Sequence, residues 1–211
     1  MDQPYQQKNW WLIRHAPVAT DKIYGQMDIA ADFSDTARLE EIARSLPDKA
    51  AYYSSDLQRC IQTATRIQSQ QSEPLPTIEQ FTLLREQCFG SWEGRSYSEI
   101  EKYDAEAYES FWLDSARNTP SGGESFIAMS KRVTVLLERW IKAEPERNIV
   151  VSTHAGPIRA IIGYALNLTP QKMLSLSIAP LSVSRLISFT RGSETNWQID
   201  SINDRGGIRQ Q

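Results

Sequence analysis

The sequence predicts an α/β fold, a three-layer sandwich in which helices flank a largely parallel central sheet. Short apolar runs alternate along the chain with longer segments whose apolar residues recur at helical spacing. That alternation is typical of a parallel sheet covered by helices. The length of 211 residues, with 40% hydrophobic and 23% charged residues, suits one soluble domain with a full core. We therefore expect a single domain over residues 1–211.

The first part of the chain alternates strand and helix signals. Residues 9–14 form a mostly apolar run before a proline-containing break, which predicts a buried strand. Ser34 is the expected N-cap of a helix that ends near residue 45. Residues 50–54 predict a second strand and 56–70 a second helix. A third strand is expected at 77–81, after a proline-rich stretch.

Residues 88–123 differ from their surroundings, because they are rich in glycine, serine, aromatic and acidic residues. Short helical patterns cover 97–103 and 105–113, and a Pro-Ser-Gly-Gly break ends the segment. We interpret it as a helical insertion over one end of the sheet, above the active site. The stretch 91–114 has seven acids and two bases, a local charge of −5. Over a binding pocket, this charge would disfavour highly anionic ligands; the alternative is a solvated helix face.

The second half predicts a long helix over 123–143 and a fourth strand over 147–153. Gly156 and a proline in the first turn begin the next helix, which ends near residue 166. The last two strands are expected at 182–189 and 197–202 around a turn at a glycine, and the tail after residue 203 is expected to be loosely held.

Composition excludes several function classes. The formal charge of −3 argues against a nucleic-acid-binding or anionic membrane surface, and no apolar run is long enough to span a membrane. No secretory signal is evident. Cys60 and Cys88 are the only cysteines, too few for a disulfide framework or a cysteine-built zinc site. We expect two reduced thiols in the cytoplasm. No metal or cofactor motif is present.

Only two histidines occur, so a catalytic site that needs two imidazoles must use both. His15 follows the first predicted strand, and His154 follows the fourth, 139 residues later. Ligands of parallel sheets bind beyond the carboxyl ends of the strands, so the fold can bring both side chains together.

Further charged groups suit phosphate chemistry. Arg14 and Arg59 lie where a strand meets a loop or helix, and Glu86 lies beside a glycine-rich turn, with Glu93 as a second acid nearby. Arginine binds phosphate oxygens in a fork and stays charged. Neutral imidazole is a nucleophile, and N–H groups where the helix begins near Gly156 can stabilise an anion. Together these parts can transfer a phosphoryl group without a metal.

The sequence resembles the histidine phosphatase superfamily, with its phosphoglycerate-mutase-like fold, and in particular its small phosphatases. The family's Arg-His-Gly motif corresponds to Arg14-His15-Ala16, with alanine in place of glycine. Residues 55–64 match a Ser-x-Leu-x-Arg-x-x-x-Thr-Ala pattern, and 84–94 match Leu-x-Glu-x-x-Phe-Gly-x-Trp-Glu-Gly. The second histidine of the family precedes a glycine, as His154 does. The resemblance extends from about residue 11 to 189.

The resemblance implies a role for each site residue. His15 attacks phosphorus and becomes a phosphohistidine, while Arg14, Arg59 and a protonated His154 bind the phosphoryl oxygens. Glu86 protonates the leaving oxygen and then activates water. We expect a hydrogen bond that holds His15 in one tautomer.

Substrate-binding candidates are Tyr24, Gly25 and Ser55. The Tyr-Gly-Gln-x-Asp segment at 24–28 resembles one in α-ribazole-5′-phosphate phosphatases. The function expected is therefore a metal-independent phosphomonoester hydrolase without a cofactor. Its partner would be a small phosphorylated metabolite, for example a nucleoside-like 5′-monophosphate such as α-ribazole phosphate. Two alternatives stay open, a phosphoglycerate mutase and a non-catalytic phospho-ligand binding protein. The oligomeric state is also open.

Overall fold

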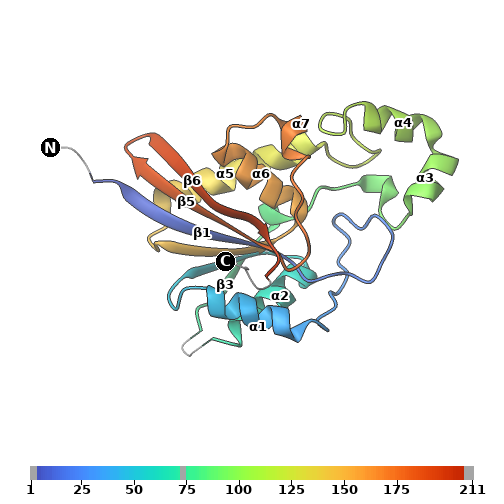
Figure 1. The fold of residues 1–211 in the computed structure, drawn as a ribbon. Helices are drawn as coiled ribbons and strands as arrows, with labels where there is room; N and C mark the ends of the chain where they lie inside the picture. The colour runs from blue at the N-terminus through green and yellow to red at the C-terminus, as the bar shows by residue number, and fades with distance from the viewer. Residues whose placement is uncertain (1–3, 72–74, 207–211) are drawn as a thin grey trace.

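The computed structural model describes residues 4–71 and 75–206. Its sheet has six strands in the order β3-β2-β4-β1-β5-β6 (Figure 1). The four strands from β3 to β1 are parallel, β5 runs antiparallel to β1, and β6 pairs antiparallel with β5. The predicted α/β fold with a largely parallel sheet is confirmed. In chain order the strands are β1 Gln6–Arg14, β2 Ala51–Ser55, β3 Ile78–Phe81, β4 Asn148–Thr153, β5 Val183–Arg191 and β6 Glu194–Asp204.

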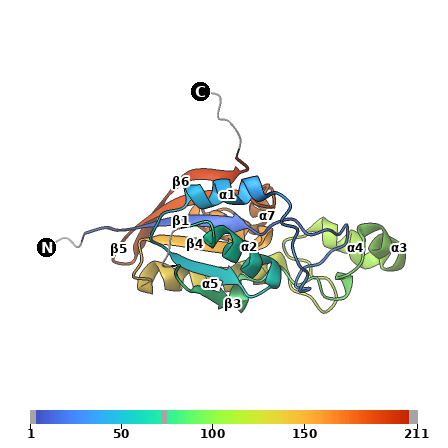
Figure 2. The ribbon, with the colours of Figure 1, turned by 90° about the horizontal axis from the view of Figure 1, so that it is seen from below.

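Helices cover both faces of the sheet (Figures 1 and 2). Helices α1 (Thr36–Ser45) and α2 (Gln58–Gln68) lie on one face. Helices α5 (Phe126–Ala143) and α6 (Ala155–Ala165) lie on the other, beside the short α7 (Pro170–Met173). None of the helices in the described ranges combines the length and apolarity needed to cross a bilayer.

The insertion contains two short helices, α3 (Tyr97–Tyr103) and α4 (Ala105–Leu113), where the sequence predicts them. They extend beyond the carboxyl ends of the parallel strands (Figure 2). A small apolar cluster, which includes Ile23, Trp92 and Phe111, packs these helices against the loop between β1 and α1. This cluster is separate from the two main cores. The insertion therefore packs as a unit of its own beyond the strand ends (Figure 2).

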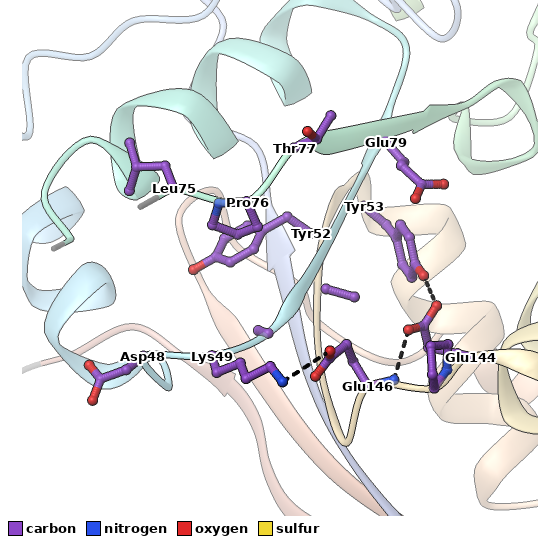
Figure 3. A pocket seen from close by; sticks show the side chains of 13 residues that line it. Asp48, Lys49, Tyr52, Tyr53, Leu75, Pro76, Thr77, Glu79, Glu144 and Glu146 are labelled. Atoms are coloured by element: carbon purple, nitrogen blue, oxygen red, sulfur yellow. Dashed lines mark hydrogen bonds and ion pairs between the residues drawn. The ribbon is translucent and has the colours of Figure 1, made fainter. Parts of the chain in front are cut away.

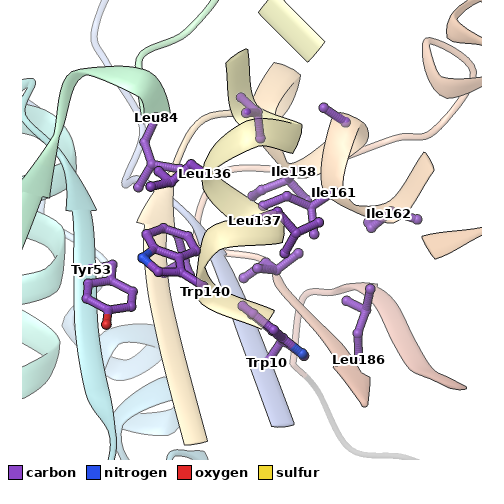
Figure 4. Close-up of a cluster of buried hydrophobic side chains, with 14 of the residues drawn as sticks. Trp10, Tyr53, Leu84, Leu136, Leu137, Trp140, Ile158, Ile161, Ile162 and Leu186 are labelled. Carbon is purple, nitrogen blue, oxygen red and sulfur yellow. The ribbon is translucent and has the colours of Figure 1, made fainter. Parts of the chain in front are cut away.

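The two cores follow from the alternation of side chains along each strand. In β1, Trp10 and Leu12 face α5 and α6, whereas Trp11 and Ile13 face α1 and α2. Figure 4 shows the larger core, in which Trp140 of α5 is labelled. Its ring stacks on a tyrosine of β2, with centroids 4.4 Å apart and planes at 6°. Such pairs add about 0.5–1.5 kcal/mol to the gain from area burial.

Local details differ from the predictions. The N-cap of α1 is Asp35, whose carboxylate accepts the N–H of Arg38, because the Ser34 hydroxyl instead donates to Asp32. Helix α7 was not predicted, because four residues are too few to show a helical period. Its Met173 packs on Gly163 of α6 so closely that a side chain larger than hydrogen at residue 163 would collide with the methionine. The hairpin of β5 and β6 turns at Gly192 as predicted. The end of the tail, 207–211, lies outside the described residues.

Two residues on opposite sides of α5 test this packing. Leu137 is buried and Val135 is 64% exposed. Leu137→Ala should lower the free energy of unfolding by about 2–5 kcal/mol, because it removes core contacts and leaves a cavity. Val135→Ala is the matched control and should change it by less than about 0.5 kcal/mol. Urea denaturation measures both values, and equal effects of the two substitutions would contradict the assigned core face.

Candidate active site

The two histidines meet where β1 and β4 end. These strands pair in parallel, so Arg14, the last residue of β1, lies opposite Thr153, the last residue of β4. The residue that follows each strand is a histidine. The N–H of His15 donates to the Thr153 carbonyl at 2.9 Å, which extends the pairing by one residue. The ring centroids of His15 and His154 lie 5.1 Å apart at an interplanar angle of 65°, and both side chains are buried. The structure thus brings together residues 139 positions apart.

One hydrogen bond sets the tautomer of His15. Its Nδ1 lies 2.7 Å from the Ala16 carbonyl oxygen, which can only accept, so Nδ1 carries the proton. Nε2 therefore has the lone pair, and the expected orienting hydrogen bond is present. Burial lowers the pKa of His15 to about 3; the hydrogen bond to Ala16 opposes this, and the charges of Arg59 and Arg14 add to it. The imidazole is neutral at physiological pH.

The resemblance implies a protonated His154 when a phosphoryl group is bound, whereas the hydrogen bonds of this ring in the structure are those of a neutral imidazole. Its Nδ1 accepts a hydrogen bond from Arg59 Nε at 3.3 Å, and its Nε2 lies 2.9 Å from the Ser55 hydroxyl. A nitrogen that accepts from a guanidinium cannot also carry a proton. Burial lowers the pKa of His154 well below its ordinary value, with further lowering by His15 and the arginines around it.

Arg59 joins three parts of the site from the first turn of α2. Although charged, the residue is fully buried. Its Nη1 donates to the Met27 carbonyl and its Nη2 to the Gly25 carbonyl, each at 2.6 Å, while Nε donates to His154. Two of its five N–H groups remain for a ligand. The ring of Tyr24 lies under the guanidinium, 5.0 Å from it.

Arg14 is the second cation near the histidines. Its Nη1 donates to the Ile178 carbonyl at 2.6 Å, and its Nε is buried without a hydrogen-bond partner in the described part of the chain. Its charge lowers the pKa of both histidines. Residues 4–71 and 75–206 contain no carboxylate in an ion pair with either arginine. Two cations without carboxylate partners in the described residues have N–H groups that can donate to an anion, and buried charges need such compensation.

Glu86 approaches the site from the loop after β3. Its carboxylate accepts the N–H of Gly156, with distances of 3.1 and 3.2 Å to the two oxygens, and the N–H of Gln87 at 3.0 Å. Gly156 lies in the first turn of α6, and a Cβ there would be 2.2 Å from the carboxylate. Glycine at this position therefore allows Glu86 to reach the beginning of the helix.

Glu93, the second acid, has a different position. Its Oε1 accepts the N–H groups of Gln26 and Phe89 at 2.9 and 3.0 Å. It lies so close to Gly25, where φ is +29°, that a Cβ there would be 2.2 Å from Oε1. Glu93 thus holds the loop whose carbonyls accept from Arg59. Arg85, next to Glu86, forms a bidentate ion pair with Asp56 at 2.5 and 2.8 Å.

The donor chemistry near the histidines is not that of a metal site. Within the described ranges, no three histidine, cysteine, aspartate or glutamate side chains come together in a way that could hold a metal ion. The two thiols are free, and Cys60 is buried against His154, with Sγ 3.3 Å from Nε2. Burial raises the pKa of the Cys60 thiol, which therefore stays protonated.

Comparison with known proteins agrees with this geometry. Residues 10–205 match the model of the histidine phosphatase superfamily (branch 1). The chain belongs to the histidine phosphatase superfamily. It is 30% identical over 169 residues to the adenosylcobalamin/alpha-ribazole phosphatase of Escherichia coli, a match that covers 77% of this chain and 81% of the relative. This histidine phosphatase family member is accordingly a phosphatase.

Two further relatives show how far the similarity extends. A metal-independent phosphoserine phosphatase of Arabidopsis thaliana is 29% identical over 202 residues, covering 92% of this chain and 80% of the relative. The crystal structure of the alpha-ribazole phosphatase from Shigella flexneri superposes with a TM-score of 0.81 at 23% identity, over 95% of this chain and 99% of that chain. The latter likeness concerns the fold alone.

The replacement of the family's glycine by Ala16 causes no backbone strain. Ala16 is fully buried and is not among the residues with positive φ. Its N–H donates to the Thr63 hydroxyl at 3.0 Å, and that hydroxyl donates to the Arg59 carbonyl at 2.6 Å. The methyl group is therefore accommodated in a normal conformation, and the alanine links the His15 loop to helix α2.

Sequence analysis missed the residues that hold the Glu86 loop from behind. Arg132 of α5 donates to the carbonyls of Leu83, Arg85 and Glu86 at 2.7–2.9 Å and pairs with Glu124 at 2.6 Å. Cys88 N–H also donates to Glu124. In the sequence, Glu124 and Arg132 are two polar residues of the helix predicted over 123–143, and they are indistinguishable from residues on its solvent face. Carbonyl partners belong to the folded chain and leave no trace in the sequence.

A cavity of about 300 Å³ begins at Glu86 and Gly156 and extends under the insertion. Its lining from the insertion is mainly aromatic: Phe89, Trp92, Tyr97, Phe111 and Trp112. Of the seven insertion acids, none lines it; Glu99 caps α3 and Asp114 pairs with Arg117. The acids of this stretch therefore do not face the cavity, and Glu93 and Asp104 accept hydrogen bonds within the protein instead.

A larger cavity of about 560 Å³ lies at the opposite, amino-terminal edge of the sheet (Figure 3). There the Tyr53 hydroxyl donates to Glu144, and Lys49 pairs with Glu146 at 3.4 Å. None of the predicted site residues lines it. The histidines, arginines and glutamate predicted for the active site therefore lie away from this cavity, toward the carboxyl ends of the parallel strands.

The buried neutral histidines predict a pH-dependent stability. Both pKa values are lower in the folded protein than the ordinary 6.5 of the unfolded chain, so the unfolded state binds more protons below pH 6.5. This stability is complete above that pH and is lost as the pH falls toward 3. From pH 7.5 to 5.5 the free energy of unfolding should fall by about 2–3 kcal/mol.

Urea denaturation at the two pH values measures this change. His15→Asn should remove about half of the drop, since it leaves one buried imidazole. A free energy of unfolding that is equal at pH 7.5 and 5.5 would contradict the neutral state of both rings.

Proposed function

We propose that the protein is a metal-independent phosphomonoesterase that works through a phosphohistidine at His15. The observation that carries this proposal is the state of that imidazole: neutral, with its proton fixed on Nδ1 by Ala16. The Nε2 lone pair attacks phosphorus as the ester P–O bond breaks. Water then attacks the phosphohistidine, releasing inorganic phosphate and restoring the imidazole.

Charge stabilisation in this mechanism comes from side chains. Arg14 and Arg59 form no ion pair with a carboxylate of the described residues and can donate to the phosphoryl oxygens. Burial, and then the charges of nearby groups that include Arg59 and Arg14, lower the pKa of His154. A bound phosphate dianion opposes the effect of these charges, so we expect His154 to gain a proton with the substrate as its Nδ1 gives up the hydrogen bond from Arg59. Ser55, which contacts His154, and Tyr24, beside Arg59, complete the proposed phosphate site.

Glu86 is the proposed proton donor and acceptor. In its acid form it protonates the leaving oxygen, and as a carboxylate it then takes a proton from the attacking water. Its place between the Gly156 N–H and the cavity supports this role. Glu93 Oε1 accepts two hydrogen bonds, both from backbone N–H groups, which favours a structural role for that acid.

The proposed substrate is a small phosphorylated metabolite with a ring in its alcohol part. An aromatic-walled cavity beside the proton donor suits such a leaving group. A nucleoside-like 5′-monophosphate fits this description, and the names of several relatives point to α-ribazole phosphate as an example. Gly25 contributes through its backbone, since its carbonyl orients Arg59.

Phosphate release in EDTA tests the reaction. The purified protein should release inorganic phosphate from p-nitrophenyl phosphate and from ring-bearing monophosphates at pH 5–8. Its activity should not fall on the acidic side near pH 6.5, because burial holds the pKa of His15 near 3. His15→Ala should abolish turnover and the acid-labile phosphoenzyme. Isomerisation of a phosphorylated substrate without phosphate release would instead indicate a mutase.

The leaving-group dependence tests Glu86. Glu86→Gln should slow hydrolysis of alkyl phosphates by about 10²–10⁴-fold, because their alkoxides need a proton. p-Nitrophenyl phosphate, whose leaving group is stable as an anion, should be slowed much less. Glu93→Gln is the matched control and should slow both substrates to a similar extent. Equal slowing of both substrates by Glu86→Gln would remove the proton-transfer role.

A further inference from the structure

Arg159 of α6 is a cation that the proposed reaction does not use. Among the described residues it is the one positively charged side chain that lines the cavity beside Glu86. It lies three residues after Gly156, so both are on the same face of the helix. Arg159 therefore faces the side on which Glu86 meets the leaving group.

The hydrogen bonding of Arg159 is incomplete. Its Nε donates to the Leu176 carbonyl at 2.8 Å, which fixes the direction of the guanidinium. Its Nη1 and Nη2 have no hydrogen-bond or ion-pair partner in residues 4–71 and 75–206. Glu86 is the side chain whose charge acts most on it, ahead of Arg14. A half-buried guanidinium with four unused N–H groups in a cavity can donate hydrogen bonds to a pair of ligand oxygens.

The side chains that line the cavity from the insertion are mainly aromatic, and two of them are partly exposed to solvent. Tyr97 and Trp112 are each 50% exposed, with ring centroids 6.1 Å apart. Trp112 also meets the buried Phe111 edge to face, with centroids 5.2 Å apart and planes at 82°. An incoming ring would bury exposed aromatic surface and find edges and faces arranged for stacking.

We propose that this cavity binds the alcohol part of the substrate as an aromatic ring that carries a carboxylate, with Arg159 as the carboxylate ligand. This inference rests on the proposed phosphomonoesterase function and adds an anionic group to its substrate. One guanidinium matches one carboxylate in a bidentate pair. A second phosphate fits less well, because its greater charge would lie beside Glu86 among apolar walls with one cation to balance it.

A matched substrate pair tests the assignment. Phenyl phosphate and 3- or 4-carboxyphenyl phosphate share a ring and a phenolic leaving group, and they differ in the carboxylate. The wild-type protein should prefer the better carboxylated isomer in kcat/KM by about ten- to hundred-fold, the usual effect of a charged hydrogen-bonded pair. Arg159→Met should bring that ratio close to one, mainly through a higher KM for the carboxylated substrate.

Two control variants sharpen the result. Arg159→Lys keeps the charge without the fork, so its ratio should be intermediate. Arg117→Met removes a cation that pairs with Asp114 in the insertion, so it should leave the ratio unchanged. A wild-type ratio of one or less, or a ratio that survives Arg159→Met, would overturn the proposal. An equal loss of both substrates in Arg159→Met would do so too, because it would make Arg159 a phosphate ligand.

A binding measurement separates this proposal from the enzyme mechanism. Benzoate should quench tryptophan fluorescence, because Trp92 and Trp112 line the cavity. The apparent Kd should rise by about ten-fold or more in Arg159→Met and stay unchanged in Arg117→Met. If benzoate binds in this way but neither phenyl phosphate is hydrolysed, the phosphatase mechanism fails and the binding site stands. If both are hydrolysed without carboxylate preference and benzoate does not bind, the carboxylate site fails alone.

Discussion

The parallel pairing of β1 with β4 is the constraint on which the rest of the site depends. It places Arg14 opposite Thr153, so both strands end together, and the following residues are the two histidines. The hydrogen bond from His15 N–H to Thr153 then fixes the backbone of the first imidazole relative to the second. A shift of this register by one residue would send the strand side chains to the opposite face and separate the rings.

Buried positive charge gives the site its chemical character. Arg59 and the half-buried Arg14 bond to backbone carbonyls, which hold their direction without neutralising them. Their fields and the loss of water keep both imidazoles neutral, so one ring is available as a nucleophile at pH values where a free histidine would be charged. The energetic cost of this arrangement is offset by the two cores, which hold the strand ends in place, and by an anion when one binds.

The insertion supplies the aromatic side of the cavity beside Glu86. Its aromatic cluster holds α3 and α4 at the strand ends, where Tyr97 and Trp112 face the cavity beside Glu86. The core of the protein supplies the opposite side of that cavity through Gly156 and Arg159. In the proposed function, the alcohol part of the substrate and the phosphoryl group would contact different segments of the chain, so the insertion can change without disturbing the histidines.

The sequence by itself determined the order of the six strands and of the helices other than α7. It also singled out two arginines, two histidines and one glutamate as site candidates. Apolar periodicity and short motifs such as Arg14-His15 are local properties, and they survive in the folded chain. Tertiary structure alone decided that His154 is neutral, that Glu86 accepts the Gly156 N–H while Glu93 accepts that of Gln26, and that Arg132 donates to carbonyls of the Glu86 loop. The reason is that desolvation and hydrogen bonds to distant carbonyls arise from packing, and no local pattern of residues encodes them.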